Sequence, residues 1–350
     1  MVCFIVPPYL LERIASLDDP RFTTASAAAQ QSLALVRPYV GVMAGEAPPP
    51  TRIAPRSLVA GRTIEAVRRT LSDAHNSEKL PGTLVRSEGD AATSDSAVTE
   101  AWAGLGDTHA LYAEVYDRAS IDDDNLRLDA TVHYGDRYDN AFWNGERMIF
   151  GDGDNEVFTR FTASVSVIGH ELTHGVTQYT AGLDYQGQSG ALNESISDVF
   201  GALVEQYSLG QTVAQASWLI GSGIFTDHVQ GSAIRSMKAP GTAYDDDVLG
   251  KDPQPADMSG YVETTDDNAG VHLNSGIPNR AFYLVAAALG GNAWKGAGQI
   301  WYDTLTGGTL STAATFAEFA TATAGAARAR FGQGAELDAV VAAWSMVGVK

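Results

Sequence analysis

Residues 167–177 read VIGHELTHGVT, inside the longer run 165–179 whose apolar spacing predicts a helix. A spacing of four residues puts His170 and His174 on one helix face, where both imidazoles can bind one metal ion. Glu171 then points beside the ion, where a carboxylate can take a proton from a metal-bound water. The same pattern also arises by chance as surface or core histidines. The motif alone leaves both interpretations open.

A catalytic zinc site needs a third protein ligand and an open fourth position. Glu194 supplies a candidate in ALNESISDVFG, residues 191–201, and the glycines between His174 and Ala191 allow the chain to reverse. A helix predicted over 191–207 then returns past the first, with Asp198 one turn after Glu194. Asp198 can accept the free N–H of a ligating histidine and fix its tautomer. An exposed, acidic start of a helix is the alternative interpretation. The combined spacings of His170 with His174 and of Glu194 with Asp198 favour the metal site.

A third element reads DDNAGVHLNSG at residues 266–276 and contains His272. Taken in order, HELTH, NESISD and DNAGVHLNSG resemble the thermolysin family of zinc metallopeptidases. The resemblance runs from about Leu80 to the C-terminus and includes NAFWNG from Asn140, FGDGD, AGLDY and the RSM at 235–237. It implies an α+β fold, with a β-rich N-terminal lobe, a mainly helical C-terminal lobe and the zinc helix on the floor of the cleft between them.

The activity that the resemblance implies is that of a metalloendopeptidase, a hydrolase that cuts on the amino side of bulky hydrophobic residues with a Glu-activated, zinc-bound water. Tyr185 and His272 would donate hydrogen bonds to the oxyanion, and Asp267 would hold His272. Three residues would align the substrate backbone: Asn140, Ala141 and Arg235. Four apolar residues match the pocket-lining region and are equally explained as ordinary core: Phe158, Phe161, Val167 and Ile234.

Two departures from the family pattern bear on stability. Ala269 stands where the family usually has glycine, so a methyl group would tighten the backbone there without abolishing activity. The family's double calcium site uses carboxylates that are replaced here by Ser166, Ser217, Leu219 and Ser222. Calcium needs six to eight oxygen ligands, several of them charged at strong sites. The double calcium site is therefore predicted to be absent, and one catalytic Zn²⁺ is the expected cofactor.

The first residues, MVCFIVPPYLL, resemble the short precursor segment of protealysin-like members of the family. We expect this segment to act as an intramolecular inhibitor, with Phe4, Ile5 and Val6 in the cleft and Pro7 and Pro8 opposing cleavage around them. A docked N-terminal arm without a regulatory role is the alternative. Cys3, the only cysteine, could approach the zinc as a thiolate, but a lone cysteine between apolar residues is more often simply buried.

Composition limits the partners. The net charge of −19 disfavours nucleic acid and anionic membranes, which leaves protein and peptide substrates as the expected partners. No apolar run is long enough to span a membrane, and the N-terminus lacks the basic start and apolar core of a signal peptide. A cytoplasmic location and export by a route without a classical signal peptide both remain open. A single cysteine also excludes a cysteine-based zinc cage.

The chain divides into three predicted parts. Residues 1–50 form a propeptide with helical spacing over 9–40, and the proline-rich stretch 45–57 is a linker. Residues 58–180 form the β-rich lobe that ends in the zinc helix, and residues 181–350 form the helical lobe. Further helices are predicted at these ranges: 97–116, 276–289 and 313–327.

Two other functions compete with an endopeptidase. An aminopeptidase can use the same two-histidine, one-glutamate zinc site, but it needs an acidic anchor for the free amine of its substrate. A catalytically silent zinc domain that serves as an interaction module gives no reason for Glu171, Tyr185 and His272 to occur together.

Overall fold

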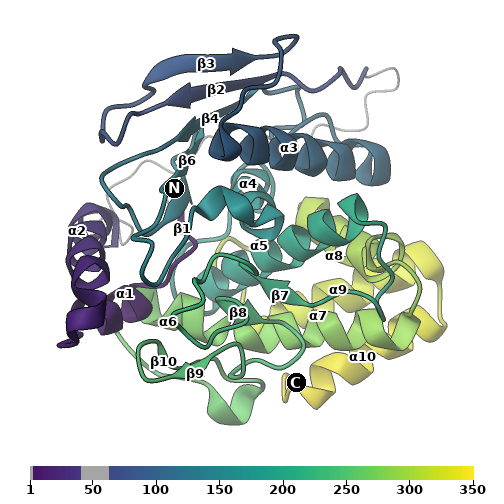
Figure 1. Cartoon of the computed structure of the whole chain (residues 1–350). Coiled ribbons are helices and arrows are strands. Elements are labelled where there is room, and N and C mark those ends of the chain that lie inside the picture. The colour runs from purple at the N-terminus through teal and green to yellow at the C-terminus, as the bar shows by residue number, and fades with distance from the viewer. Residues whose placement is uncertain (1–2, 41–62) are drawn as a thin grey trace.

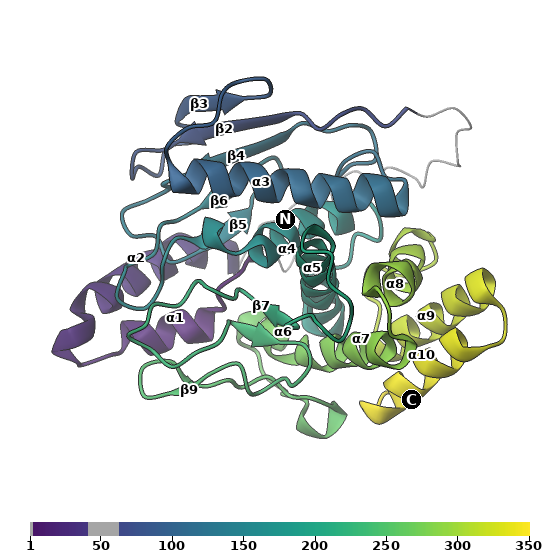
Figure 2. The same cartoon turned by 45° about the vertical axis from the view of Figure 1, so that its right-hand side comes forward.

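The computed structural model describes residues 3–40 and 63–350. The stretch 45–57, predicted to be a linker, lies outside the described residues. Figure 1 shows strands at one end of the molecule, helices at the other, and the N-terminal segment against the side where the two meet. Figure 2 shows α4 and α5 running through the middle, between the sheet and the C-terminal helices.

The N-terminal segment begins in an extended conformation and continues as helices. Its elements are β1 (Cys3–Phe4), α1 (Pro8–Ala15), a 3-10 turn (Pro20–Phe22) and α2 (Thr23–Val40). Pro8 is the first residue of α1, where a helix requires no backbone N–H, so the two prolines start the helix rather than break it. The helical spacing predicted over 9–40 is confirmed, with an interruption between the two helices.

The β-rich lobe contains a sheet of six strands in the order β1-β5-β6-β4-β2-β3. The remaining strands are β2 (Arg69–Asp73), β3 (Thr83–Ser87), β4 (Leu128–Val132), β5 (Ala141–Trp143) and β6 (Met148–Phe150). Pairing is parallel between β2 and β4 and between β4 and β6, and antiparallel elsewhere. The N-terminal segment therefore supplies the edge strand next to β5, a pairing that the sequence pattern did not predict.

Two helical elements of this lobe pack near the sheet. Helix α3 (Ser96–Ala110) begins at Asp95, whose side chain accepts a hydrogen bond from the N–H of Val98, and it continues as a π-helical turn (Leu111–Val115). Helix α4 (Val165–Gln178) carries the HELTH motif, and its residues from Ser166 to Thr177 are all buried. A helix buried on every side can carry polar groups only where they have partners.

The C-terminal lobe is mainly helical. Its helices are α5 (Gly187–Ser208), α6 (Asp267–Asn274), α7 (Gly276–Leu289), α8 (Ala297–Thr306), α9 (Phe316–Phe331) and α10 (Ala335–Met346). Two small hairpins pair β7 (Leu219–Ile220) with β8 (Arg235–Ser236), and β9 (Asp245–Asp246) with β10 (Gly250–Lys251). The α+β fold class is confirmed. Among the described residues, no helix is long and apolar enough to cross a membrane.

Helices α4 and α5 approach each other at glycines. A Cβ added to Gly201 of α5 would lie 2.5 Å from the carbonyl oxygen of Ser166 and 3.0 Å from the backbone nitrogen of His170, both in α4. A Cβ on Gly169 would in turn lie 3.1 Å from the Cα of Gly201. The two backbones therefore touch, and this contact fixes how far the side chains of α5 stand from the histidines of α4.

Replacing Gly201 with alanine is expected to destabilise the protein by about 1–3 kcal/mol, because the methyl group would overpack this contact between two backbones. The thermal unfolding midpoint measures the effect. Gly325→Ala in α9 is the matched control, since its new Cβ would meet no heavy atom within 4 Å, and it should stabilise the helix by about 0.5–1 kcal/mol. A Gly201→Ala protein as stable as the parent would contradict the described packing.

Candidate metal centre and substrate groove

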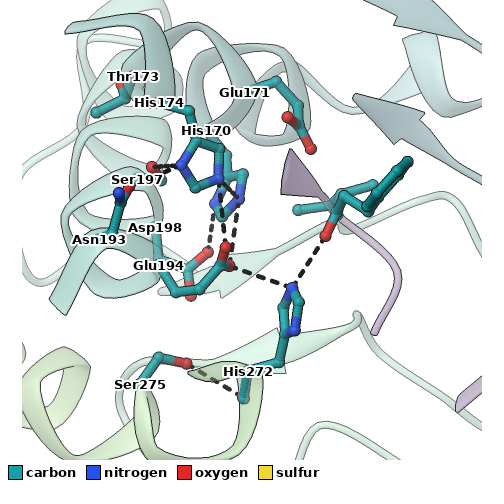
Figure 3. A network of polar contacts seen from close by, with 12 residues as sticks. His170, Glu171, Thr173, His174, Asn193, Glu194, Ser197, Asp198, His272 and Ser275 are labelled. Carbon is teal, nitrogen blue, oxygen red and sulfur yellow. Dashed lines mark hydrogen bonds and ion pairs between the residues drawn. The ribbon is translucent and has the colours of Figure 1, made fainter. Parts of the chain in front are cut away.

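His170 and His174 present their Nε2 atoms to each other at 3.0 Å, and each ring uses Nδ1 for another contact (Figure 3). His170 Nδ1 lies 2.8 Å from Asp198 Oδ1, and His174 Nδ1 lies 2.9 Å from Asn193 Oδ1. Asn193 donates its amide N–H to Leu183 O, which turns its oxygen toward His174. Because both partners accept, each Nδ1 carries the proton. The lone pairs of the two Nε2 atoms then face each other and repel. A cation between them would remove this repulsion.

Glu194 of α5 completes a set of three metal-binding groups. Its Oε2 lies 3.5 Å from His170 Nε2, and its Oε1 lies 3.4 Å from His174 Nε2. The carboxylate is fully buried, and Oε2 has no hydrogen-bond partner within the described part of the chain. Ligands at 2.0–2.1 Å from a tetrahedral ion are separated by roughly 3.3 Å. These residues therefore fit zinc in the type of their donor atoms, in the distances between them and in the lack of another partner for Glu194 Oε2.

Asp198 supports His170 and also binds Arg235. Arg235 donates from Nε to Asp198 Oδ2 at 2.9 Å and from Nη2 to Oδ1 at 2.8 Å, and Asn279 donates to Oδ2 at 2.8 Å. Burial would raise the pKa of Asp198, but Arg235 and His170 outweigh it and lower that pKa to about 2. The carboxylate is thus ionised and fully hydrogen-bonded, as a buried charge requires.

Glu171 stands beside the metal-binding set, as Figure 3 shows. Its Oε2 accepts a hydrogen bond from the backbone N–H of Trp143 at 3.0 Å, whereas Oε1 is buried and without a partner among the described residues. Burial, with a smaller contribution from Glu194, raises the pKa of the Glu171 carboxyl well above its ordinary value. A carboxyl group in this state is suited to proton exchange with a reacting group.

His272 approaches the same centre from the C-terminal lobe. Asp267 Oδ1 lies 2.6 Å from its Nδ1, and Asp267 Oδ2 accepts from its backbone N–H at 2.9 Å. His272 Nε2 lies 3.6 Å from Glu194 Oε2 and 3.2 Å from the hydroxyl of Tyr185, which in turn hydrogen-bonds to Glu194 Oε1. Burial lowers the pKa of His272, but Asp267 and Glu194 outweigh it and raise that pKa to about 9.

A left-handed turn at the start of α6 lets the Asp267 carboxylate contact both the ring and the backbone N–H of His272. Asp267, Asn268, Ala269 and Gly270 have φ values of 51°, 50°, 63° and 75°. Only glycine adopts this conformation without a penalty, so Ala269 costs on the order of 1 kcal/mol here. The methyl group that Ala269 adds at this position is therefore accommodated with a strained, left-handed backbone.

Residues 3–6 occupy the edge of β5 that faces this centre. Cys3 pairs with Trp143 and Phe4 with Phe142 in antiparallel register, and the N–H of Ile5 donates to Ala141 O at 3.2 Å. The Asn140 amide holds both the N–H and the carbonyl of Val6, at 2.9 and 3.2 Å. Arg235 Nη1 donates to Ile5 O at 3.0 Å, and His272 Nε2 lies 3.1 Å from Phe4 O.

The structure thus brings together all eleven residues singled out in the sequence. They are the residues predicted to bind the metal, to support it, to exchange the proton, to bind the oxyanion and to hold the substrate backbone: His170, His174, Glu194, Asp198, Glu171, Tyr185, His272, Asp267, Asn140, Ala141 and Arg235. Sequence reasoning missed Asn193, Ser197 and Asn279. Ser197 Oγ lies 3.1 Å from His174 Nδ1, and the spacing of Asn193 and Ser197 on one helix face was the available signal.

This fold and site define a metallopeptidase whose catalytic helix lies between a β-rich and a helical lobe. Residues 60–178 match the family model described as the thermolysin metallopeptidase catalytic domain, and residues 181–349 match the thermolysin metallopeptidase alpha-helical domain. The chain belongs to the thermolysin family of metallopeptidases, and it is a zinc-dependent endopeptidase.

Relatives resemble it over most or all of its length. An extracellular metalloprotease of Pectobacterium carotovorum subsp. carotovorum is 49% identical, over 100% of this chain and 97% of that protein. Protease PrtS of a Photorhabdus species is 51% identical over 82% of this chain and 77% of its own length. The solved precursor of protealysin from Serratia proteamaculans is 48% identical, with a TM-score of 0.89 over 99% of this chain and 100% of that one.

Proposed function

We propose that this chain is the precursor of a neutral endopeptidase that cuts on the amino side of bulky hydrophobic residues. The observation that carries the proposal is the path of residues 3–6 along β5, with the Phe4 carbonyl at His272 and the Ile5 backbone held by Ala141 and Arg235. The Phe4–Ile5 bond therefore corresponds to the bond that a substrate would present. Ile5, the residue after it, is fully buried in the main apolar core, which also contains Phe158, Phe161, Val167 and Ile234.

The proposed roles follow from the contacts of each side chain. Zinc, when bound by His170, His174 and Glu194, supplies polarisation of the scissile carbonyl and a more acidic water. Glu171 takes the proton of the attacking water and delivers it to the departing amine. His272, oriented by Asp267, and Tyr185 donate to the oxyanion. Asn140, Ala141 and Arg235 hold the substrate backbone in the way that they hold residues 5 and 6.

An aminopeptidase is less well supported. Cys3 and Phe4 lie on the amino side of the Phe4–Ile5 bond and continue as a strand paired with β5. The edge of β5 therefore holds residues before the bond as well as after it. A substrate blocked at both ends separates the two activities, because an aminopeptidase requires a free amine. A catalytically silent zinc domain would bind zinc and would cut neither blocked peptides nor peptides with a free amine.

The Glu171→Ala protein is expected to bind zinc and keep its fold but to lose at least about a hundredfold in turnover, because Glu171 carries a proton and is not a ligand. His170→Ala should lose zinc. The measurements are zinc content by mass spectrometry and hydrolysis of a doubly blocked peptide, after a serine protease has cut the 45–57 stretch and been inhibited. Retention of a tenth of the parent turnover by Glu171→Ala would refute the mechanism.

We also propose that the double calcium site is absent. Ser166 accepts a hydrogen bond from the N–H of Gly221 at 3.1 Å, and Ser217 donates to Glu205 at 3.3 Å, so these side chains already have protein partners. Burial, partly offset by Ser217, raises the pKa of Glu205, which disfavours a charged calcium ligand there. One half-buried carboxyl group among hydroxyls offers too little charge for a strong calcium site.

Millimolar calcium should therefore raise the thermal unfolding midpoint by no more than roughly two degrees, because a ligand stabilises a fold only by binding it. Magnesium at the same ionic strength is the control for charge screening. A rise of roughly ten degrees with calcium alone would mean that a strong site exists.

The propeptide is proposed to comprise residues 1 to about 50, with removal by a cut between Ala44 and Ser57; the proposed lobes are 58–180 and 181–350. Its inhibitory role is supported by the contacts of residues 3–6 with the substrate-binding groups and by Arg13 of α1, which donates to Asp247 O at 2.6 Å and Val248 O at 3.2 Å. The name of the extracellular Pectobacterium relative supports export over a cytoplasmic location. The proposed partners are peptide substrates.

If the chain activates itself, the parent protein should lose its propeptide over time while Glu171→Ala stays intact. Glu171 transfers the proton in every hydrolysis that the enzyme performs, including cleavage of its own chain. Size and N-terminal sequence of both purified proteins record the outcome. Equal processing of the two would exclude self-activation. Equal peptidase activity of the intact and processed parent would exclude the inhibitory role.

A further inference from the structure

Cys3 lies inside the metal centre. Its Sγ and one ligating atom each from His174 and Glu194 are all within 4.8 Å of one another, and all three residues are buried. The Cys3 side chain is 1% exposed and packs with Tyr185 and Val271. Its backbone is fixed by the pairing of β1 with β5, opposite Trp143. The position of the thiol is thus set by sheet pairing and not by a free chain end.

The groups around the thiol independently point to a cation. The Nε2 lone pairs of His170 and His174 face each other at 3.0 Å, and Glu194 Oε2 has no hydrogen-bond partner in the described residues. Three protein ligands leave one position of a tetrahedral zinc open, which is the position that a catalytic site reserves for water or substrate. Cys3 contributes a soft sulfur donor close to two members of this set, His174 and Glu194, and thiolates are strong zinc ligands.

We propose that Cys3 is the fourth ligand of the zinc in the precursor, where its thiolate takes the place of the catalytic water. The inference rests on the zinc centre of the proposed function. Binding forms one Zn–S bond, breaks the bond between zinc and water, and releases the thiol proton to solvent. Four protein ligands make a closed, structural type of site, and loss of the propeptide restores the open, catalytic type.

This ligand explains why the precursor can hold a peptide in a substrate-like position without cutting it. The carbonyls on either side of the Phe4–Ile5 bond contact His272 and Arg235. The prolines follow at positions 7 and 8, and the N–H of Ile5 still donates to Ala141 O. The restricted backbone of proline therefore protects the bonds around Pro7 and Pro8 but not this one. Exclusion of the water by the Cys3 thiolate protects the Phe4–Ile5 bond.

X-ray absorption at the zinc edge tests the inference on the full chain carrying Glu171→Gln, which keeps an acceptor for the Trp143 N–H and prevents self-cleavage. The expected spectrum contains one sulfur at about 2.3 Å and nitrogen or oxygen ligands at about 2.0–2.2 Å. Cys3→Ser in the same background should lose the sulfur and keep the zinc. Because the chain has no other cysteine, this variant assigns the sulfur.

The outcomes separate this inference from the proposed function. Zinc bound only by nitrogen and oxygen in the chain that retains Cys3 would overturn the thiolate ligand and leave the endopeptidase intact. Failure to bind zinc in either chain would overturn the metal centre itself. A sulfur that persists in Cys3→Ser would belong to another residue and would also overturn the assignment.

A functional consequence can be measured with Glu171 present. Intact Cys3→Ser chain should be cut between Phe4 and Ile5, so that N-terminal sequencing begins at Ile5, whereas the parent keeps this bond. Equal rates of cleavage at Phe4–Ile5 in the parent and in Cys3→Ser would contradict protection by the thiolate. Circular dichroism of both chains verifies that the substitution leaves the fold unchanged.

Discussion

The contact between the backbones of α4 and α5 determines the geometry of the whole centre. Gly169 and Gly201 let the two helices approach until the carbonyl oxygen of Ser166 would clash with any added side chain at position 201. At that separation, Glu194 faces both histidines and Asp198 reaches His170. Larger residues at the crossing would move all of the α5 side chains together. The spacing of the metal-binding groups is therefore a consequence of helix packing.

Burial makes this arrangement demanding, because α4 is enclosed along most of its length. Each buried charge needs a partner of opposite sign and filled hydrogen-bonding positions. Asp198 obtains both from Arg235, Asn279 and His170. Two kinds of group would still be satisfied by a bound cation: the facing Nε2 atoms of the two neutral imidazoles, and Glu194 Oε2, which has no hydrogen-bond partner among the described residues. The same Arg235 also donates to the Ile5 carbonyl, so the hydrogen bonds of Asp198 connect through it to the N-terminal segment.

Local patterns in the sequence predicted much of this. The spacing of His170 and His174 fixed their common face, and the helices expected at 165–179, 191–207 and 276–289 correspond to α4, α5 and α7. Contacts made across large separations could not be predicted in the same way. Strand β1 has no alternation over its two residues, and its partner lies some 140 positions away. The left-handed turn at Asp267–Gly270 and the partner of Asp198 at Asn279 likewise depend on tertiary structure.

The central claim is that one zinc ion is held by side chains from these two crossing helices. Anomalous diffraction at the zinc edge, from crystals of the full chain with Glu171→Gln, tests it most directly. The account predicts one dominant peak about 2.0–2.2 Å from His170 Nε2, His174 Nε2 and a carboxylate oxygen of Glu194. A zinc peak held by other side chains, or no peak after the protein has been loaded with zinc, would contradict it.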